Sequence, residues 1–281
     1  MGRLRISAIS YLNTAPLMWD FEHGPAGPEF EVSYTIPSAC AAALAEGSAD
    51  IGIIPAAAYA NIPDLVILPG VAIAARRAVR SILLVSKVPL EKIRTVALDT
   101  SSLTSVALLK VIFAKWQGGG RVYTPMAPEV EAMLREHDAG LLIGDPALKV
   151  DRSRHLTFDL AQEWIRLTGK PFVFAFWAVR KQALRNAPAG LDLAEVFQRS
   201  RDHGREPGNL DHIARTWGPR LGMSEAGVRS YLTENVHYSL DPECVEGMEL
   251  FFRYAAECGV LPEAPRLHFL EPVAYSPERA R

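Results

Sequence analysis

The feature that most constrains this chain is the alternation, in its first half, of short apolar runs with stretches of helical spacing. The expected order is a strand at 3–9, a helix from Thr14, a strand at 30–36, a helix at 38–46 and a strand at 50–54. Such alternation is typical of α/β proteins, in which helices connect parallel strands. We therefore predict a largely parallel, doubly wound sheet, with Ser38 capping the second helix and Gly47 ending it.

A second α/β unit interrupts the first. Its expected elements are a strand at 95–98, a helix at 103–116, a strand at 121–124, a helix at 128–136 and a strand at 139–143. The apolar run 172–179 then returns as a strand, and four helices follow at 191–200, 210–217, 224–236 and 242–258. We predict a discontinuous domain 1 (1–86 plus 179–281, with the C-terminal helices) and an inserted domain 2 (87–178). Two crossover strands would join them around a ligand cleft.

Composition excludes several classes of function. The chain has 30 basic and 32 acidic residues without a dense basic stripe, so a nucleic-acid partner is not expected. Its longest apolar stretch is broken at Pro69 and Gly70, and no membrane span is predicted. The N-terminus lacks the apolar core of an export signal, which predicts a cytoplasmic protein. Three scattered cysteines favour reduced thiols over a metal site, and no dinucleotide or nucleotide motif is present. No cofactor or metal is expected, and the oligomeric state is not specified.

Polar side chains gather where the predicted strands end. In the segment 10–17, Ser10, Tyr11, Asn13 and Thr14 precede a helix start, where they could either bind a ligand or cap the helix. In the segment 99–105, hydroxyl groups open a helix whose dipole favours an anion, although one of them would suffice as a cap. These hydroxyl groups belong to Thr100, Ser101, Ser102 and Thr104.

Two further positions are open to more than one interpretation. Asp145 follows the strand 139–143 and could orient a substrate hydroxyl or cap a turn. Arg80 and Ser81 lie on the first crossover, where neighbouring side chains of a regular strand face opposite sides, so only one of them could reach the cleft. None of the seven histidines lies in these loops, and a protein general base is not evident. The residues alone thus predict a two-domain binder of a small anion.

Four stretches resemble the chorismate dehydratase family of the futalosine menaquinone pathway, namely SAISYLNTAPL, ADIGIIPAAAYA, VRSILLVS and LLIGDPAL. The resemblance implies a periplasmic-binding-protein type II fold and a cofactor-free carbon–oxygen lyase. Its substrate would be the dicarboxylate chorismate, which loses the C3 proton and the C4 hydroxyl to give 3-[(1-carboxyvinyl)oxy]benzoate and water. Contacts near the reacting centre are implied for Asn13 and Ser81, and carboxylate ligands for Ser101, Ser102 and Thr104. Other implied substrate contacts are Ser10, Tyr11, Thr100 and Asp145.

Two alternatives stay open beside this interpretation. The related dihydroxynaphthoate synthase shares the fold, but its N-terminal loop resembles an SPCPND pattern rather than SYLN. A non-catalytic small-anion binding or sensor protein would close on its ligand without reacting. Because the loops offer no histidine, we hypothesise that the enolpyruvyl carboxylate of the substrate removes the C3 proton while Asn13 and Ser81 orient it.

Overall fold

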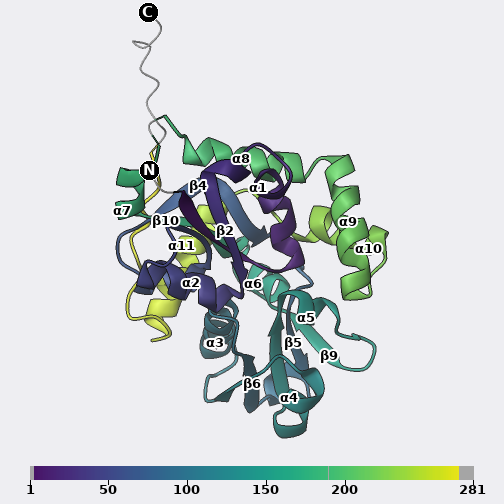
Figure 1. Ribbon diagram of the computed structural model, residues 1–281. Helices are drawn as coiled ribbons and strands as arrows, with labels where there is room; N and C mark the ends of the chain where they lie inside the picture. The colour runs from purple at the N-terminus through teal and green to yellow at the C-terminus, as the bar shows by residue number, and fades with distance from the viewer. Residues whose placement is uncertain (1–2, 189, 272–281) are drawn as a thin grey trace, which may run out of the picture.

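A computed structural model describes residues 3–188 and 190–271 and contains two five-stranded sheets, one above the other in Figure 1. The upper sheet has the order β2 (Phe30–Thr35), β1 (Leu4–Ile9), β3 (Ile51–Pro55), β10 (Phe172–Arg180) and β4 (Leu65–Ala75). The lower sheet has the order β7 (Val122–Met126), β6 (Thr95–Asp99), β8 (Ala139–Ile143), β5 (Ile82–Ser86) and β9 (Leu156–Asp159). The α/β class is thereby confirmed.

Both sheets are mixed rather than uniformly parallel. β1 runs parallel to β2 and β3, as the alternation predicts, whereas β10 is antiparallel to β3 and β4. The lower sheet repeats this arrangement, because β6 is parallel to β7 and β8 while β5 is antiparallel to β8 and β9. In each sheet the antiparallel strand is the one that enters from the other domain.

The chain changes sheets at residues other than those expected. β5 pairs within the lower sheet, so 82–86 belongs to domain 2, and β10 pairs within the upper sheet, so 172–178 belongs to domain 1. The expected boundaries at 86 and 179 are therefore wrong by about one strand each. An apolar run predicts a strand but not the sheet in which that strand finds its partners. The two connections are the short segments 76–81 and 169–171, not crossover strands.

Helices cover both sheets and make up most of the C-terminal part (Figure 1). In the first half they are η1 (Leu12–Met18), α1 (Trp19–Glu22), η2 (Gly27–Glu29), α2 (Pro37–Glu46), η3 (Ala56–Asn61), η4 (Leu90–Lys92), α3 (Thr104–Trp116) and α4 (Val130–Glu136). In the second half they are α5 (Gly144–Leu148), α6 (Leu160–Thr168), α7 (Lys181–Asn186), α8 (Leu193–Gly204), α9 (Pro207–Leu221), α10 (Glu225–Ser230), the π-helical turn η5 (Tyr231–Asn235) and α11 (Pro242–Glu257). The four predicted C-terminal helices are confirmed.

Local sequence explains several of these boundaries. Gly47 ends α2 in the left-handed conformation with φ 78°, as expected. Ser38 does not cap α2. The helix begins one residue earlier, at Pro37, so Ile36 is the N-cap residue, and it makes no side-chain hydrogen bond. Every residue of β10 except the last is buried, which fits a strand covered on both faces.

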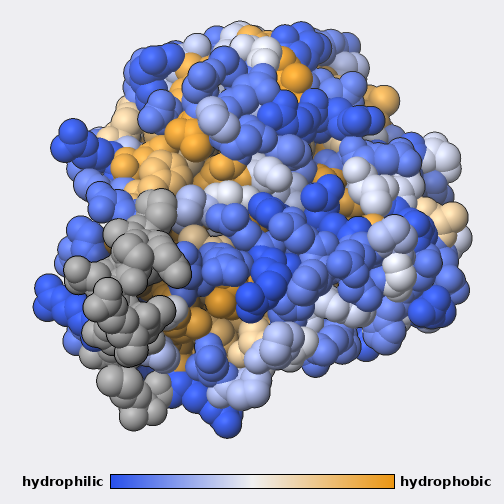
Figure 2. Space-filling model, turned by 90° about the horizontal axis from the view of Figure 1, so that it is seen from above, coloured by the Kyte–Doolittle hydropathy of each residue, from blue (hydrophilic) through white to orange (hydrophobic). Residues whose placement is uncertain are grey.

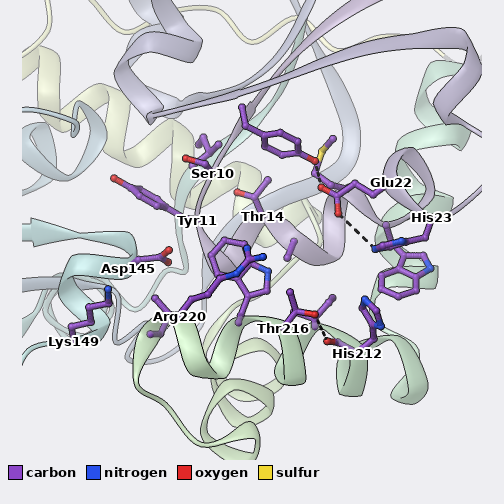
Figure 3. Close-up of a pocket in the computed structure, with 18 residues that line it drawn as sticks. Ser10, Tyr11, Thr14, Glu22, His23, Asp145, Lys149, His212, Thr216 and Arg220 are labelled. Atoms are coloured by element: carbon purple, nitrogen blue, oxygen red, sulfur yellow. Dashed lines mark hydrogen bonds and ion pairs between the residues drawn. The ribbon is translucent and has the colours of Figure 1, made fainter.

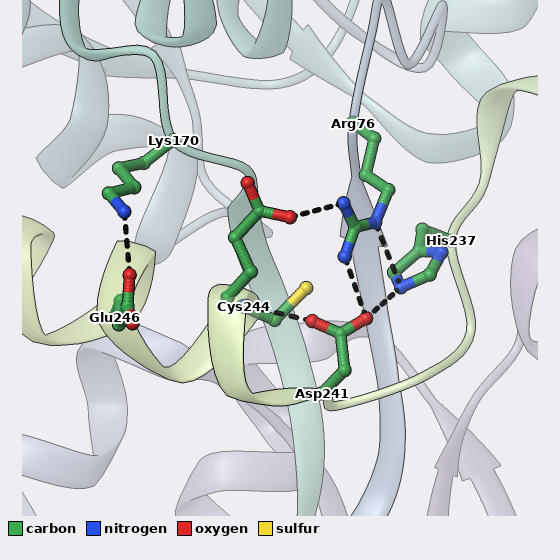
Figure 4. Close-up of polar contacts among 7 residues, drawn as sticks. Arg76, Lys170, His237, Asp241, Cys244 and Glu246 are labelled. Carbon is green, nitrogen blue, oxygen red and sulfur yellow. Dashed lines mark hydrogen bonds and ion pairs between the residues drawn. The ribbon is translucent and has the colours of Figure 1, made fainter.

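Helix α11 braces both connections between the domains (Figure 4). On the first, Arg76 pairs with Asp241 at 2.9 Å and also with Glu243. On the second, Lys170 pairs with Glu246 at 2.6 Å, and a Cβ added at Gly247 would lie 2.2 Å from the carbonyl oxygen of Pro171. One helix thus contacts both connections between the domains.

The surface offers no broad apolar band on the face that Figure 2 presents, where hydrophilic residues dominate and the hydrophobic areas are separate. Within 3–188 and 190–271, none of the helices has the length and apolar character needed to cross a membrane.

Candidate active site

Two cavities lie at the junction of the domains. The inner cavity, of about 50 Å³, has the polar walls Tyr11, Asn13, Ser102, Thr104 and Ser105 and apolar walls that include Ile9, Ile73, Ile82, Ile143 and Phe174. The outer pocket, of about 580 Å³, is bounded by η1, α1, α5 and α9 and is shown in Figure 3. Tyr11 lines both spaces and therefore forms part of the partition between them.

The Ser81 hydroxyl meets a buried residue from the C-terminal part of the chain, Tyr231. The phenol of Tyr231 donates a hydrogen bond to the Ser81 hydroxyl at 2.9 Å, and both side chains are completely buried. Burial raises the pKa of Tyr231 well above its ordinary value, and the hydrogen bond with Ser81 offsets only part of that rise. The phenol is therefore a neutral donor across the physiological range.

The main chain around Ser81 is held in an unusual conformation. Arg80 has a φ of 67°, which a residue with a Cβ rarely adopts. The carboxylate of Asp159 accepts hydrogen bonds from the backbone N–H groups of Val79 at 3.2 Å and Arg80 at 2.6 Å. The Ser81 carbonyl oxygen accepts from the Gly144 N–H at 2.8 Å. These contacts fix the position from which the Ser81 hydroxyl meets Tyr231.

The hydroxyl groups before α3 take different roles. Asp99 accepts hydrogen bonds from the N–H and the hydroxyl of Ser101, and that hydroxyl lies 3.3 Å from the phenol oxygen of Tyr11. Thr104 accepts from the Ala57 N–H of the other domain at 3.0 Å. No described residue pairs with the Ser102 hydroxyl, which lines the inner cavity. Thr100 is exposed and lines neither cavity.

Asp145 also connects the domains. Its carboxyl group, at the start of α5, accepts a hydrogen bond from the Leu12 N–H of η1 at 3.0 Å. Burial raises the pKa of Asp145 to about 6, against smaller opposing effects from the Leu12 N–H and the Lys149 charge. One residue earlier, a Cβ at Gly144 would lie 2.4 Å from the Tyr11 ring. Only glycine permits this close approach.

Together these contacts describe a closed cleft. Tyr11 to Ser101, Leu12 to Asp145 and Ala57 to Thr104 all join domain 1 to domain 2. An inner cavity of about 50 Å³ is far below the roughly 300–1,000 Å³ of sites for small organic ligands. A ring-sized ligand can enter only after the domains separate or the lining side chains move.

The structure thus brings most of the predicted positions to the domain junction. Asn13, Tyr11, Ser102 and Thr104 line the inner cavity, and Ser101 bonds to its wall. Ser10 and Asp145 line the outer pocket. Sequence reasoning missed Tyr231, because the predicted helix 224–236 contains no visible mark of the π-helical turn that aims this phenol at Ser81.

One group of potential metal ligands lies apart from the cleft, at the start of α11, where Asp241 pairs with Arg76. A nitrogen of His237, a carboxylate oxygen of Asp241 and the sulfur of Cys244 lie within 4.8 Å of one another. Asp241, however, already pairs with Arg76, and burial is the largest effect that raises the pKa of the Cys244 thiol to about 12. The ion pair between Arg76 and Asp241 and the protonated thiol of Cys244 fit a structural cluster better than a metal centre.

The chain is similar to known proteins over most of its length. Residues 4–257 match a protein-family model described as menaquinone biosynthesis. A chorismate dehydratase from Thermus thermophilus is 31% identical over 276 residues, which cover 92% of this chain and 96% of that protein. Among solved structures, a protein from Archaeoglobus fulgidus superposes with a TM-score of 0.69 at 18% identity, covering 92% of this chain and 98% of that one. The periplasmic aliphatic sulphonate binding protein of Escherichia coli has a TM-score of 0.67 at 18% identity, covering 99% and 95%. The predicted periplasmic-binding-protein fold is confirmed.

Proposed function

This chain belongs to the menaquinone biosynthesis family, and we propose that it is a chorismate dehydratase, a carbon–oxygen lyase that makes 3-[(1-carboxyvinyl)oxy]benzoate and water. The observation that carries the proposal is that Asn13, Ser102 and Thr104, from both domains, line one inner cavity at the domain junction. Ser81 precedes the cavity-lining Ile82 and is held by the buried Tyr231 phenol. Asn13 and Ser81 both come from segments that the family resemblance singles out.

In the proposed reaction the C3–H bond and the C4–O bond of chorismate break. The electron pair of the C3–H bond moves into the ring, which becomes aromatic, and the C4 hydroxyl leaves with a proton as water. Negative charge spreads from C3 through the ring to its carboxylate in the transition state. Donors preorganised around that carboxylate would stabilise the charge more in the transition state than in the substrate.

The start of α3 supplies such donors. Ser102 and the first residues of α3, a helix of 13 residues, line the inner cavity, where the helix dipole favours an anion. Ser102, Ser105 and Thr104 are therefore our proposed surroundings for the ring carboxylate. Ser101 acts indirectly, because its hydroxyl is engaged with Asp99 and Tyr11.

Asn13 and Ser81 would orient the enolpyruvyl side chain. No histidine is among the described residues that line the inner cavity, so the substrate's own enolpyruvyl carboxylate remains our proposed base for the C3 proton. Tyr231 donates to the Ser81 hydroxyl, so the Ser81 proton is not used in that bond. Ser81 is buried and lines neither cavity, so in this proposal it meets the substrate when the domains have opened. Closure of the domains would exclude water while charge develops.

The proposal is tested by mixing the purified protein with chorismate and following the ultraviolet spectrum as the cyclic diene becomes an aromatic ether. The double variant Asn13→Ala, Ser81→Ala is expected to lose at least about 100-fold in rate, because it loses both orienting groups. The matched control makes the same chemical changes at exposed positions, Ser48→Ala with Asn61→Ala, and should react like the parent.

Two outcomes would contradict the proposal. A near-normal rate in the Asn13→Ala, Ser81→Ala protein would remove these residues from the site. Binding of chorismate without any conversion would instead indicate the non-catalytic small-anion protein considered above.

A further inference from the structure

The outer pocket is a ligand-sized cavity that Asn13, Ser102 and Thr104 do not line, although Ser10, Tyr11 and Asp145, for which the resemblance implies substrate contacts, lie on its wall. Its volume of about 580 Å³ lies within the range of small-molecule sites, and it is separate from the inner cavity. Tyr11 stands between the two, with its phenol at Ser101 and its ring against Gly144. The pocket therefore exists while the catalytic cleft is closed.

Aromatic rings form one wall of this pocket. The rings of Trp19, His23 and His212 form a cluster with centroid separations of 4.4, 5.6 and 5.2 Å. Trp217 lines the pocket from α9 and is only half-buried. In Figure 3, His23 and His212 lie on one side, and Tyr11 lies on the other. Exposed aromatic faces around a cavity favour a planar ring as ligand.

Two cationic side chains also line the pocket, Lys149 from α5 and Arg220 from α9. Neither has an ion-pair partner within 4 Å among residues 3–188 and 190–271, and Arg220 lies over the Trp217 ring at 5.4 Å. The two carboxyl groups on the wall are both engaged, because Asp145 accepts from Leu12 and Glu22 accepts from Tyr34. A hydrogen bond from a neutral donor does not cancel the charge of a carboxylate, so the wall carries both acidic and basic groups, and Arg220 and Lys149 are the groups that can pair with an anion.

From this combination we propose that the outer pocket is a second binding site, specific for aromatic carboxylates, in which Arg220 and Lys149 pair with the carboxylate and Trp217 contacts the ring. An aromatic dicarboxylate is the product class of the proposed reaction, whereas the substrate is not aromatic. The pocket is then where product resides after it leaves the cleft. That link to product rests on the proposed function; the binding chemistry does not.

The test measures the binding of 3-methoxybenzoate, an aromatic meta-ether carboxylate, by isothermal titration calorimetry. Two comparison ligands separate the contributions: 3-methoxybenzamide lacks the charge, and 3-methoxycyclohexanecarboxylate lacks the planar ring. Both are expected to bind at least about tenfold more weakly, since each loses a contact that corresponds to about 1.4 kcal/mol or more.

Variants locate the site. Arg220→Gln and Trp217→Leu should each weaken 3-methoxybenzoate binding by about three- to tenfold. The matched control is Arg215→Gln, which removes an exposed arginine from the same helix outside the pocket and should leave binding unchanged. The Asn13→Ala, Ser81→Ala protein should also bind normally, because neither residue lines the outer pocket.

The results separate this inference from the proposed function. Unchanged binding in both Arg220→Gln and Trp217→Leu would overturn the second site, and so would loss of binding in the Asn13→Ala, Ser81→Ala protein, because the ligand would then occupy the cleft. Binding that depends on Arg220 in a protein without dehydratase activity would support the second site and refute the proposed function alone.

Discussion

The phenol oxygen of Tyr231 lies 2.9 Å from the hydroxyl oxygen of Ser81, and the two residues are 150 positions apart in the chain. Tyr231 belongs to the C-terminal part of domain 1, whereas Ser81 ends the first connection to domain 2. The bond therefore links the orientation of a proposed substrate contact to the packing of the C-terminal helices.

We expect Tyr231→Phe to lower kcat by about ten- to hundredfold while changing KM by less than about twofold, because the Ser81 hydroxyl loses its fixed direction but keeps its place. Stability should fall by only about 0.5–1.5 kcal/mol. The control is Tyr238→Phe, since the Tyr238 hydroxyl is buried without a partner among the described residues and its removal should be neutral or stabilising. Steady-state kinetics and urea unfolding check both expectations. Equal kinetic losses in the two variants would refute a specific role for Tyr231.

Asp145 should give the stability of the protein a particular pH dependence. Its pKa is raised from 3.8 to about 6, so between these values the folded protein holds a proton that the unfolded chain releases. The free energy of unfolding therefore falls as pH rises through this window. Asp145→Asn retains an acceptor for the Leu12 N–H but cannot ionise, and it should avoid about 1–2 kcal/mol of that loss after allowance for solvent screening. Urea unfolding at pH 4 and pH 7 measures the difference. Parallel pH profiles for the two proteins would contradict the raised pKa.

The two hydroxyl groups at the start of α3 should respond differently to substitution. Thr104→Val leaves the Ala57 N–H without its acceptor, and we expect a loss of about 1–3 kcal/mol in stability together with a higher KM. Ser102→Ala should raise KM while leaving stability within about 0.5 kcal/mol, because no described residue bonds to that hydroxyl. Thermal unfolding and steady-state kinetics distinguish them. A large stability loss in Ser102→Ala would assign Ser102 a structural role instead.

Helix α11 should not tolerate a side chain at Gly247, where the helix packs against the second connection between the domains. A Cβ there would lie 2.2 Å from the Pro171 carbonyl oxygen, which is backbone and cannot easily move aside. We expect Gly247→Ala to destabilise the protein by about 2–3 kcal/mol. Gly208→Ala is the control, since no atom lies within 4 Å of the added Cβ and the helix should gain about 0.5–1 kcal/mol. Similar unfolding free energies for the two variants would mean that α11 can shift away from the second connection.

Much of the architecture was predictable because it depends on local patterns. The alternation of apolar and helical stretches predicted the parallel arrangement of β1, β2 and β3, and helical spacing predicted α8, α9 and α11. Polar residues at strand ends were expected to lie at a cleft between the domains, and Asn13 and Ser102 line the inner cavity there.

The sequence by itself determined the elements, the α/β class and which loops carry polar side chains. Only the tertiary structure decided that β5 pairs within the sheet of domain 2 and β10 within the sheet of domain 1. It also decided that hydrogen bonds such as that from the Leu12 N–H to Asp145 close the cleft, and that the Tyr231 phenol reaches Ser81. The physical reason is distance along the chain. Helix and strand formation depend on residues a few positions apart, whereas sheet partnership and side-chain meeting points depend on packing among segments separated by a hundred residues or more.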